Sequence, residues 1–590
     1  MAVEQLITQH IDTWTSALKT RSTAGRGSNG KIDLYGIKKL RDLILELAVH
    51  GKLVPQDPND EPASELLKRI AAEKAALVKQ GKIKKQKPLP EISEDEKPFK
   101  LPVGWEWARL GEFTSIIRGI TFPGSEKSNT GAMGKIACLR TANVQDNIEW
   151  HDLIYISDSF VKRQEQYLQD NDIVMSMANS RELVGKVALA KLTSEKSITF
   201  GGFLSVLRPL KINVSYLMAL LRSDTNKTQL IESASQTTNI ANISLAKLNP
   251  LVVGIPPADE QSRIVLKFNE LMSLCDQLEQ QSLTSLDAHQ QLVETLLATL
   301  TDSQNTEELA ENWARISQHF DTLFTTEASI DALKQTILQL AVMGKLVPQD
   351  PNDEPASELL KRIEQEKAQL VKEGKIKKQK PLPPVNDEEK PFVLPQGWEW
   401  VQVQDICSKI TDGEHSTPPR SESGYYLLSA RNITNYGISV SDVDYVPAEV
   451  FSKIRSRCDP NIGDVLISCS GSIGRVALVD KDDAYSMVRS AAMIRPVSGK
   501  LNLQYIMNAL KSPMLQTQMT IRSKKSAQAN LFLGAISCLV LPLPPMKEQI
   551  AISLKINEFH NLCDNLKSRL QSAQQIQLHL ADALTDAALT

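Results

Sequence analysis

The chain carries one stretch of twenty residues twice. Residues 51–70 and residues 344–363 both read GKLVPQDPNDEPASELLKRI. The likeness continues with a few changes through GKIKKQKPLP, at 81–90 and 374–383, to GWEW, at 104–107 and 397–400. The sequence between the two copies does not visibly repeat. Near-identical connectors around dissimilar inserts predict an internal duplication that carries two different heads.

Length and composition limit the class of protein. At about 150 residues per domain, the 590 residues allow roughly four domains. No run of about 18 apolar residues is present, so we expect no membrane span. The start, MAVEQLITQHIDTW, lacks the features of a signal peptide. The seven cysteines form no CxxC pair, which predicts buried thiols in a reducing cytoplasm and neither disulfides nor a zinc site.

The charge is distributed unevenly. The whole chain has a formal net charge of −3. Residues 105–257 hold 16 Lys+Arg against 14 Asp+Glu, and residues 398–545 hold 15 against 13, so each insert is +2 and the remainder is −7. This small difference permits a local basic face on each insert without demonstrating one.

Each copy of the repeat predicts two helices and a connector. Apolar residues at helical spacing begin the copy, and a proline-broken extended segment follows. Asp60 is then expected to cap a helix that ends at Gly81, with Asp353 and Gly374 in the second copy. The basic run KIKKQKPLP reads as an exposed linker, with phosphate contact as the alternative.

The two inserts share a coarse order of short strands followed by a helix. Asp172 corresponds to Asp464, and residues 185–187 correspond to 474–476. In the second insert, residues 501–519 predict one helix. Each insert closes on a PPxxEQ motif, at 256–261 and 544–549.

A long amphipathic helix follows each PPxxEQ motif. The apolar residues repeat in steps of four and three, which predicts a narrow seam that packs on another helix: Ile264, Phe268, Leu271, Cys275 and Leu278, matched by Ile552, Ile556, Phe559, Cys563 and Leu566. The pattern loosens after about two heptads. Both a coiled coil and a helical bundle therefore remain open.

The chain offers no catalytic constellation. GRGSNGK, at 25–31, satisfies GxxxxGK, but Ile32 stands where a phosphate loop needs Ser or Thr, and no apolar strand precedes it. No HExxH or GxSxG is present, and no Pro-Pro pair fits a base methyltransferase. We therefore expect a chain that is not an enzyme, with no catalytic residue, metal site or cofactor of its own.

Polar side chains suited to reading DNA recur in the predicted loops of both inserts. Arg and Lys suit guanine edges or phosphates, Asn and Gln suit adenine, and Ser and Thr serve either. The candidates in the first insert are Arg118, Lys135, Arg140, Thr141, Asn143, Asn179, Ser180, Arg181, Thr237, Thr238 and Asn239. Those in the second are Thr411, Glu414, His415, Arg420, Ser429, Arg431, Asn432, Ser470, Ser472, Arg475, Arg489, Arg522, Lys524 and Lys525.

With these motifs the chain resembles the specificity subunit of type I restriction–modification systems. The resemblance rests on LPxGWEW at 101–107 and 394–400, GDVLIS…GSIGRVAL at 463–478, the two PPxxEQ motifs and the duplication. The long N-terminal repeat is similar to the IB, or EcoA-like, branch. The first insert departs from the pattern with NDIVMSMANSRELVGKVAL.

The resemblance implies an α+β multidomain fold. Two α/β target recognition domains would be separated by long antiparallel helices, with pseudo-twofold symmetry. It further implies that each domain reads half of a bipartite, asymmetric duplex DNA site. The expected partners are two methyltransferase subunits and restriction/translocase subunits, which would use S-adenosylmethionine, ATP and Mg²⁺.

The expected domains follow the motifs. They are an N-terminal helical repeat (1–100), a first head (101–257), a central helical region (258–393), a second head (394–545) and a C-terminal helix (546–590). The repeated stretch would either dock the methyltransferase or only brace the long helices. A two-headed protein-interaction scaffold is the main alternative function, and a fused modifying enzyme is a third.

Overall fold

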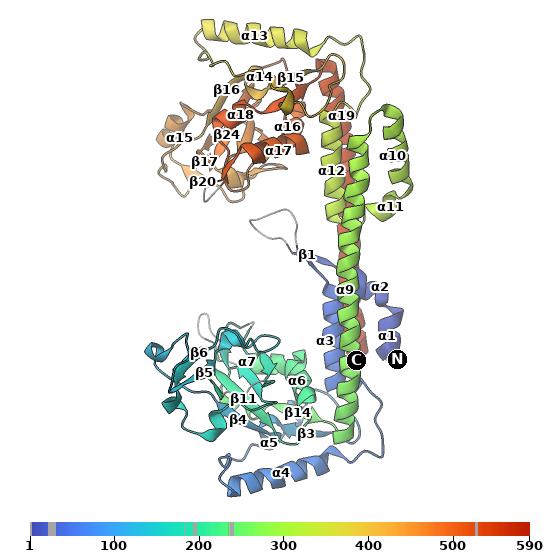
Figure 1. Ribbon diagram of the computed structural model, residues 1–590, viewed down its shortest axis with the longest axis vertical. Coiled ribbons are helices and arrows are strands. Elements are labelled where there is room, and N and C mark those ends of the chain that lie inside the picture. The colour runs from blue at the N-terminus through green and yellow to red at the C-terminus, as the bar shows by residue number, and fades with distance from the viewer. Residues whose placement is uncertain are drawn as a thin grey trace. The chain divides into compact units, whose positions relative to one another are not determined.

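The computed structural model describes residues 3–21, 31–181, 183–192, 197–233, 235–236, 241–525 and 529–589. The GxxxxGK stretch lies almost wholly outside these residues. The chain forms two compact units, each with one head (Figure 1). The first unit comprises residues 1–19, 32–283 and 574–590, and the second comprises 20–31 and 284–573.

The first copy and first head consist of short helices followed by several small sheets. The copy contains α1 (Val3–Gln9), α2 (Ile11–Ser16), β1 (Lys19–Arg21), β2 (Lys31–Asp33), α3 (Tyr35–Val49) and α4 (Ala63–Lys79). The head contains β3 (Glu106–Arg109), α5 (Leu110–Phe113), β4 (Thr114–Arg118), β5 (Lys135–Leu139), β6 (Ile154–Ser157), β7 (Ile173–Ser176), β8 (Ala178–Asn179), β9 (Val187–Leu189), β10 (Ile198–Phe200), β11 (Leu204–Pro209), α6 (Val214–Arg222), α7 (Asp224–Ser233), β12 (Ser235–Gln236), β13 (Ala241–Asn242), α8 (Leu245–Leu248) and β14 (Val252–Ile255). The long helix α9 (Ala258–Asp302) follows.

The second copy and second head repeat this order. The copy contains α10 (Thr306–Gln318), α11 (Phe320–Leu323), α12 (Glu327–Val342) and α13 (Ala356–Lys372). The head contains β15 (Glu399–Gln402), α14 (Val403–Ile406), β16 (Cys407–Asp412), β17 (Tyr425–Leu428), β18 (Ile433–Thr434), β19 (Gly437–Ile438), β20 (Asp444–Val446), α15 (Ala448–Arg455), β21 (Val465–Ser468), β22 (Val476–Leu478), β23 (Tyr485–Met487), β24 (Ala491–Pro496), α16 (Leu503–Lys511), α17 (Pro513–Arg522), β25 (Lys524–Lys525), β26 (Ala529–Asn530), α18 (Leu533–Ser537) and β27 (Val540–Leu543). The long helix α19 (Met546–Leu589) follows.

Both heads are built on one four-stranded antiparallel sheet. Its order is β4-β11-β7-β9 in the first head and β16-β24-β21-β22 in the second. The inner strands β7 and β21 are buried along their whole length. A second sheet, β10-β5-β6 or β20-β17-β23, covers part of each core. The predicted α+β fold with two α/β heads is confirmed.

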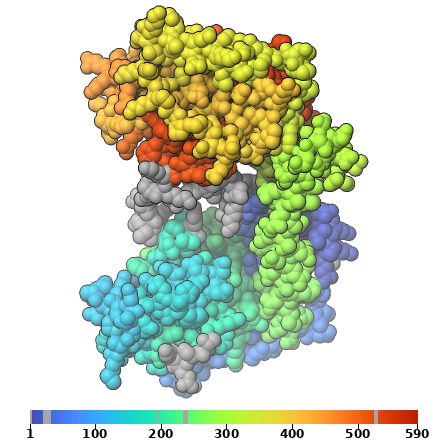
Figure 2. Space-filling view, turned by 45° about the horizontal axis from the view of Figure 1, so that its top comes forward, coloured from blue at the N-terminus to red at the C-terminus, as the bar shows by residue number. Residues whose placement is uncertain are grey.

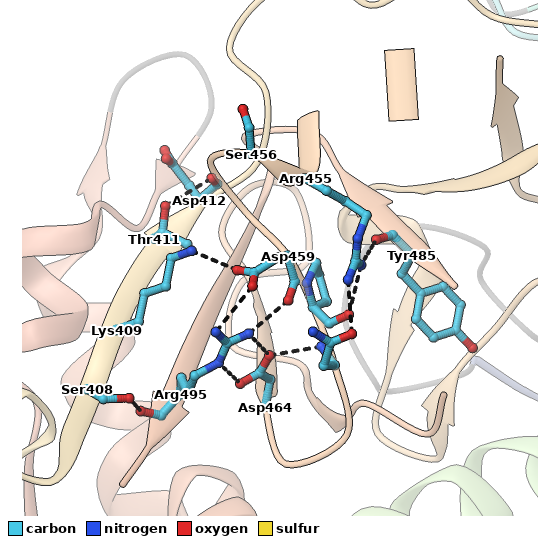
Figure 3. Close-up of polar contacts among 12 residues, drawn as sticks. Ser408, Lys409, Thr411, Asp412, Arg455, Ser456, Asp459, Asp464, Tyr485 and Arg495 are labelled. Atoms are coloured by element: carbon cyan, nitrogen blue, oxygen red, sulfur yellow. Dashed lines mark hydrogen bonds and ion pairs between the residues drawn. The ribbon is translucent and has the colours of Figure 1, made fainter. Parts of the chain in front are cut away.

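A buried ion pair holds each four-stranded sheet to the loop before its inner strand. Arg208 donates from Nε and Nη2 to the two carboxylate oxygens of Asp172, both at 2.7 Å. In the second head Arg495 donates to Asp464 in the same way, at 2.7 and 2.8 Å. Figure 3 shows that Asp459 joins this second pair, and Lys409 contacts Asp459 at 2.7 Å. We call each four-stranded sheet with its ion pair the frame of the head.

Each unit also contains a helical bundle. In the first unit α3 packs beside the beginning of α9 and the end of α19 (Figure 1), through Arg41 to Asp276 at 2.7 Å and Tyr35 to Asp582 at 2.7 Å. The contacts of α3 and of the segment that follows it, from Tyr35 to Asp60, run antiparallel to α9 and parallel to α19. The two long helices are therefore antiparallel in this unit, as predicted. The heptad seam residues are buried or half-buried, so a bundle forms around the seam.

The glutamate of each PPxxEQ motif fastens the head to the repeated stretch. Glu260 accepts hydrogen bonds from the indole of Trp105 at 3.0 Å and from Gln56 at 3.3 Å. Glu548 does the same for Trp398 at 2.9 Å and Gln349 at 3.1 Å. Burial raises the pKa of both carboxyl groups. The recurring motifs therefore meet one another inside each unit.

Two details differ from the sequence predictions. Asp60 is not the N-cap of α4, which begins at Ala63 directly after Pro62; Arg263 binds the Asp60 carboxylate instead, at 2.5 and 3.1 Å. The helix predicted over 501–519 is two helices, α16 and α17, separated at Ser512. The prediction for Gly81 is confirmed, since it follows the helix with φ of +71°.

The cysteines are reduced and mostly buried in the structure. All seven cysteines are free, six are buried and Cys538 is half-buried. Burial raises the pKa of Cys407 to about 12. Among the described residues, no helix is both long and apolar enough to cross a membrane.

Candidate nucleic-acid interface

Three cationic side chains gather around a cavity of about 620 Å³ in the first head. Arg118 comes from the end of β4, Lys127 from the following loop, and Arg140 from the residue after β5. Arg118 and Lys127 are exposed, and Arg140 is half-buried. Positive charges that converge on one hollow favour an anionic ligand.

The carboxylate of Asp152 orients one of these cations. Arg140 donates from Nη2 to the Asp152 side chain and to its backbone carbonyl, both at 2.7 Å. Thr141 also lines the cavity. The structure thus brings together the predicted residues Arg118, Arg140 and Thr141. Sequence reasoning missed Lys127, which stands beside Glu126 in a stretch with no basic cluster.

Two predicted asparagines serve the fold instead. Asn143 is 3% exposed, accepts from the backbone N–H of Arg140 at 2.9 Å and donates to the carbonyl of Glu149 at 3.1 Å. Asn432 is 2% exposed and accepts from the N–H of Ser429 at 2.9 Å in the equivalent turn. Their amides are occupied by local backbone, so we set both aside from the contact surface.

The other described candidates in the first head do not line the cavity, and three further candidates lie outside the described residues. Asn179 is half-buried in β8, and Ser180 and Arg181 are exposed directly after it. Lys135 is exposed at the start of β5. Thr237, Thr238 and Asn239 lie outside the described residues.

In the second head, two exposed arginines share one carboxylate. Arg420 lies 3.3 Å and Arg431 lies 3.1 Å from Asp444. Arg431 also lies 3.5 Å from Asp442. The shared carboxylate holds two positive groups side by side while both stay accessible.

A second cluster surrounds the end of β16. Asp412 contacts His415 at 2.9 Å and Arg457 at 2.7 Å. Sequence reasoning predicted His415 but missed Arg457, which is far from it in sequence. Thr411 is 9% exposed within β16, so we set it aside as well.

The β21–β22 turn presents further candidates. Ser468 accepts from the N–H of Arg475 at 2.9 Å and donates to the carbonyl of Ser472 at 2.5 Å, which closes the turn. Ser470 is half-buried, Ser472 is exposed and Arg475 is half-buried. The positive φ of +71° at Gly471 and +84° at Gly474 is a conformation that glycine adopts without strain.

The remaining candidates of the second head divide three ways. Arg489 is exposed. Arg522 is half-buried and donates to Glu389 at 2.5 Å, so its charge is largely taken up within the fold. Lys524 and Lys525 form β25, and the positions of their side chains lie outside the description.

One position of the frame carries opposite charges in the two heads. Arg118 ends β4 opposite Ser205 of β11, and Asp412 ends β16 opposite Ala492 of β24. A glycine follows each of them, Gly119 and Gly413. Equivalent strand ends on one scaffold therefore carry different side chains, and in the second head Arg457 and His415 bind the Asp412 carboxylate.

The sequence profile of the type I restriction modification DNA specificity domain matches residues 102–288 and 395–576. Each matched range takes in one head and the beginning of the long helix after it. The chain belongs to the family of type I restriction–modification specificity subunits. It is a subunit that confers DNA sequence specificity, and it contains two repeated recognition domains.

Relatives support the same assignment. The specificity subunit is 51% identical to the EcoEI specificity subunit of Escherichia coli and 49% identical to the EcoAI specificity subunit of Escherichia coli, over the full length of all three chains. The predicted EcoA-like branch is confirmed. The crystal structure of the HsdS subunit from Thermoanaerobacter tengcongensis shares 18% identity with a TM-score of 0.35, over 84% of this chain and 98% of that one.

Proposed function

We propose that each head reads one half of a bipartite, asymmetric site on duplex DNA. The observation that carries the proposal is the difference at equivalent strand ends of the matched frames: Arg118 is exposed in the first head, whereas Asp412 is paired with the exposed Arg457 in the second. Identical readers would give a symmetric site, whereas these two heads offer different groups to the major groove. The contact groups would be the exposed candidates described above, the half-buried Arg140 and Arg475, and also Lys127 and Arg457.

The long helices would set the distance between the half-sites. Residues 258–283 of α9 belong to the first unit and residues 284–302 to the second. A helix rises about 1.5 Å per residue, and duplex DNA rises about 3.4 Å per base pair. Four residues inserted into both α9 and α19 should therefore lengthen the gap by about two base pairs or less. Unchanged spacing in the recognised sites would sink this part of the proposal.

The repeated stretches would dock two copies of one methyltransferase subunit. Exposed residues of the first turns of α4 recur in α13, including Glu65 and Lys68 as Glu358 and Lys361. Their ion pairs, at 2.7 Å in both copies, are exposed and contribute little to stability. The yellow surface of α13 lies open along the second unit (Figure 2). An identical exposed surface that the fold does not require supports an identical partner on each copy.

Catalysis would belong to the partners. Methyltransferase subunits would bind S-adenosylmethionine and methylate adenine, and restriction/translocase subunits would use ATP and Mg²⁺. The specificity subunit would act with them in the cytoplasm.

Sequencing the methylated genomic DNA of cells that hold this chain and its partners tests the function. We expect methylation at one bipartite, asymmetric sequence. Arg475→Ala should relax one half-site only, by roughly 1–3 kcal/mol if Arg475 makes paired bonds to a base. Equal loss at both half-sites would contradict independent heads. A protein-interaction scaffold, the alternative, would show no salt-dependent, sequence-specific retention of duplex DNA.

A further inference from the structure

Phe203 projects from the frame of the first head. Its side chain is 69% exposed and lines the cavity that holds Arg118 and Arg140. The backbone there is tightly placed, because a Cβ on Gly202 would lie 2.8 Å from Thr121 Oγ1. A large aromatic ring that burial does not stabilise thus lies at a cavity lined by two arginines.

Phe532 has a similar place in the second head. It is 55% exposed and immediately precedes α18, at the N-cap position. N-caps favour Ser, Thr, Asp or Asn, whose side chains can accept from the helix N–H groups. Its ring is more than half exposed at a position where a capping side chain is usual.

Each phenylalanine lies on one side of a short backbone segment, and the side on which it lies differs between the two heads. In the first head, Met177 donates its N–H to the carbonyl of Phe203 at 2.8 Å, and its own carbonyl accepts from Ile243 at 2.8 Å. Ser244 follows Ile243. The short segment around Met177 therefore has Phe203 on one side and Ser244 on the other.

The second head repeats this arrangement with the residue types reversed. Cys469 donates to the carbonyl of Ser490 at 2.8 Å and accepts from Leu531 at 2.8 Å, and Phe532 follows Leu531. Serine stands where the first head has Phe203, and phenylalanine stands where it has Ser244. Each head thus presents one aromatic ring at this place, from opposite sides of the same backbone segment.

We propose that Phe203 and Phe532 are specificity-determining residues, each of which makes an apolar contact with the 5-methyl group of a thymine in its own half-site. This inference rests on the proposed function. Phenylalanine can distinguish thymine by its methyl group in the major groove. Arg118 and Arg140 beside Phe203, and Arg489 directly before Ser490, would hold the DNA backbone or neighbouring bases. The exchanged sides would place the contacted thymine differently in the two half-sites.

The experiment uses the full chain in complex with its methyltransferase partner. The site is first read from methylated genomic DNA, and duplexes are then made in which each thymine is replaced singly by deoxyuridine, which removes only the methyl group. Binding is measured for the wild type, Phe203→Ser and Phe532→Ser. Phe203→Leu and Phe532→Leu keep an apolar side chain and serve as conservative controls.

We expect one deoxyuridine in each half-site to weaken wild-type binding by about fourfold, the equivalent of one buried methyl group. Phe203→Ser should abolish that response in one half-site and leave the other unchanged, and Phe532→Ser should do the reverse. The leucine variants should keep most of the response. A wild type indifferent to every deoxyuridine, or serine variants that weaken all duplexes alike, would overturn the inference while the proposed function stands. Wild-type complex with no sequence preference would overturn the proposed function itself.

Discussion

The two heads match in their frames and differ where the strands of those frames end. Asp172–Arg208 and Asp464–Arg495 form the same paired contact in both heads. One or two strands away, the charge at the strand end reverses from Arg118 to Asp412. The frame therefore fixes the positions of the backbone at the strand ends, but it does not determine which side chains stand there. The side chain at a strand end can therefore change without unfolding the head that carries it.

Breaking the frame should have the largest effect. Asp172→Ala leaves the guanidinium of Arg208, which is 20% exposed, without its carboxylate. Loss of one partner of a buried pair costs about 3–5 kcal/mol. Asp464→Ala should cost less, because Asp459 remains 3.3 Å from Arg495. Urea denaturation of the two full-length variants measures the difference.

The control for this prediction removes the extra carboxylate first. Asp459→Ala with Asp464→Ala should be as destabilising as Asp172→Ala alone. If Asp172→Ala and Asp464→Ala lowered the free energy of unfolding equally, Asp459 would not compensate for the loss of Asp464. The two frames would then be alike in this respect.

The next effect should come from close packing at the glycines after the strand ends. A Cβ on Gly119 would lie 2.1 Å from the carbonyl of Gly201, and one on Gly413 would lie 2.2 Å from the carbonyl of Met487. Because backbone cannot move aside cheaply, each alanine variant should lose about 1–3 kcal/mol of stability. Gly534→Ala is the matched control, since its Cβ would meet nothing within 4 Å. Thermal unfolding of the three variants should separate the first two from the third.

The sequence predicted most of the fold because the fold repeats. Heptad spacing identified the seam of α9 and α19, and the duplicated motifs located both heads. Local pattern failed where a distant residue decides the structure. Asp60 is a residue type that is common at N-caps, but its carboxylate is bound by Arg263, which lies 203 residues later in the sequence. The sequence close to Asp60 gives no indication of this contact.

Prediction of the site was limited by a different problem. Residue type suggested Asn143 and Asn432 as readers, but both amides close the same turn in the two heads. A side chain that is retained at equivalent places in otherwise different heads indicates the frame, and that signal was available in the sequence. Arg457 could not be found, because only folding brings it to Asp412.

The reversed charge gives a smaller and more selective prediction. Arg118→Ala should weaken binding at the first half-site by about tenfold, the low end of what a paired base contact contributes. Asp412→Asn should strengthen binding at the second half-site at low salt and raise its salt dependence by about one charge, because Arg457 and His415 lose their carboxylate. Binding titrations at several salt concentrations measure both. If Asp412→Asn changed the first half-site as much as the second, the heads would not be independent.

The smallest predicted effect concerns pH, at another matched position. Lys511 at the end of α16 donates to the carbonyl of Asn435 at 2.8 Å, and burial lowers its pKa to about 8. Arg222 at the end of α6 donates to the carbonyl of Asp146 at 2.5 Å, and an arginine stays charged throughout this range. Only the second head should therefore respond to pH here.

The sign follows from the proton bound in each state. The unfolded lysine titrates near pH 10.4, so between pH 8 and that value the unfolded chain holds a proton that the folded chain has lost. The cost of burying the charge is fully present below pH 8 and is relieved as the pH rises. Relative to Lys511→Arg, the wild type should gain on the order of 1 kcal/mol between pH 7.5 and pH 9.5. Arg222→Lys should create the same response in the first head, and thermal unfolding at the two pH values compares them. If Lys511→Arg and the wild type gained equally, the buried lysine would not be the source, and the two heads would be alike at this position as well.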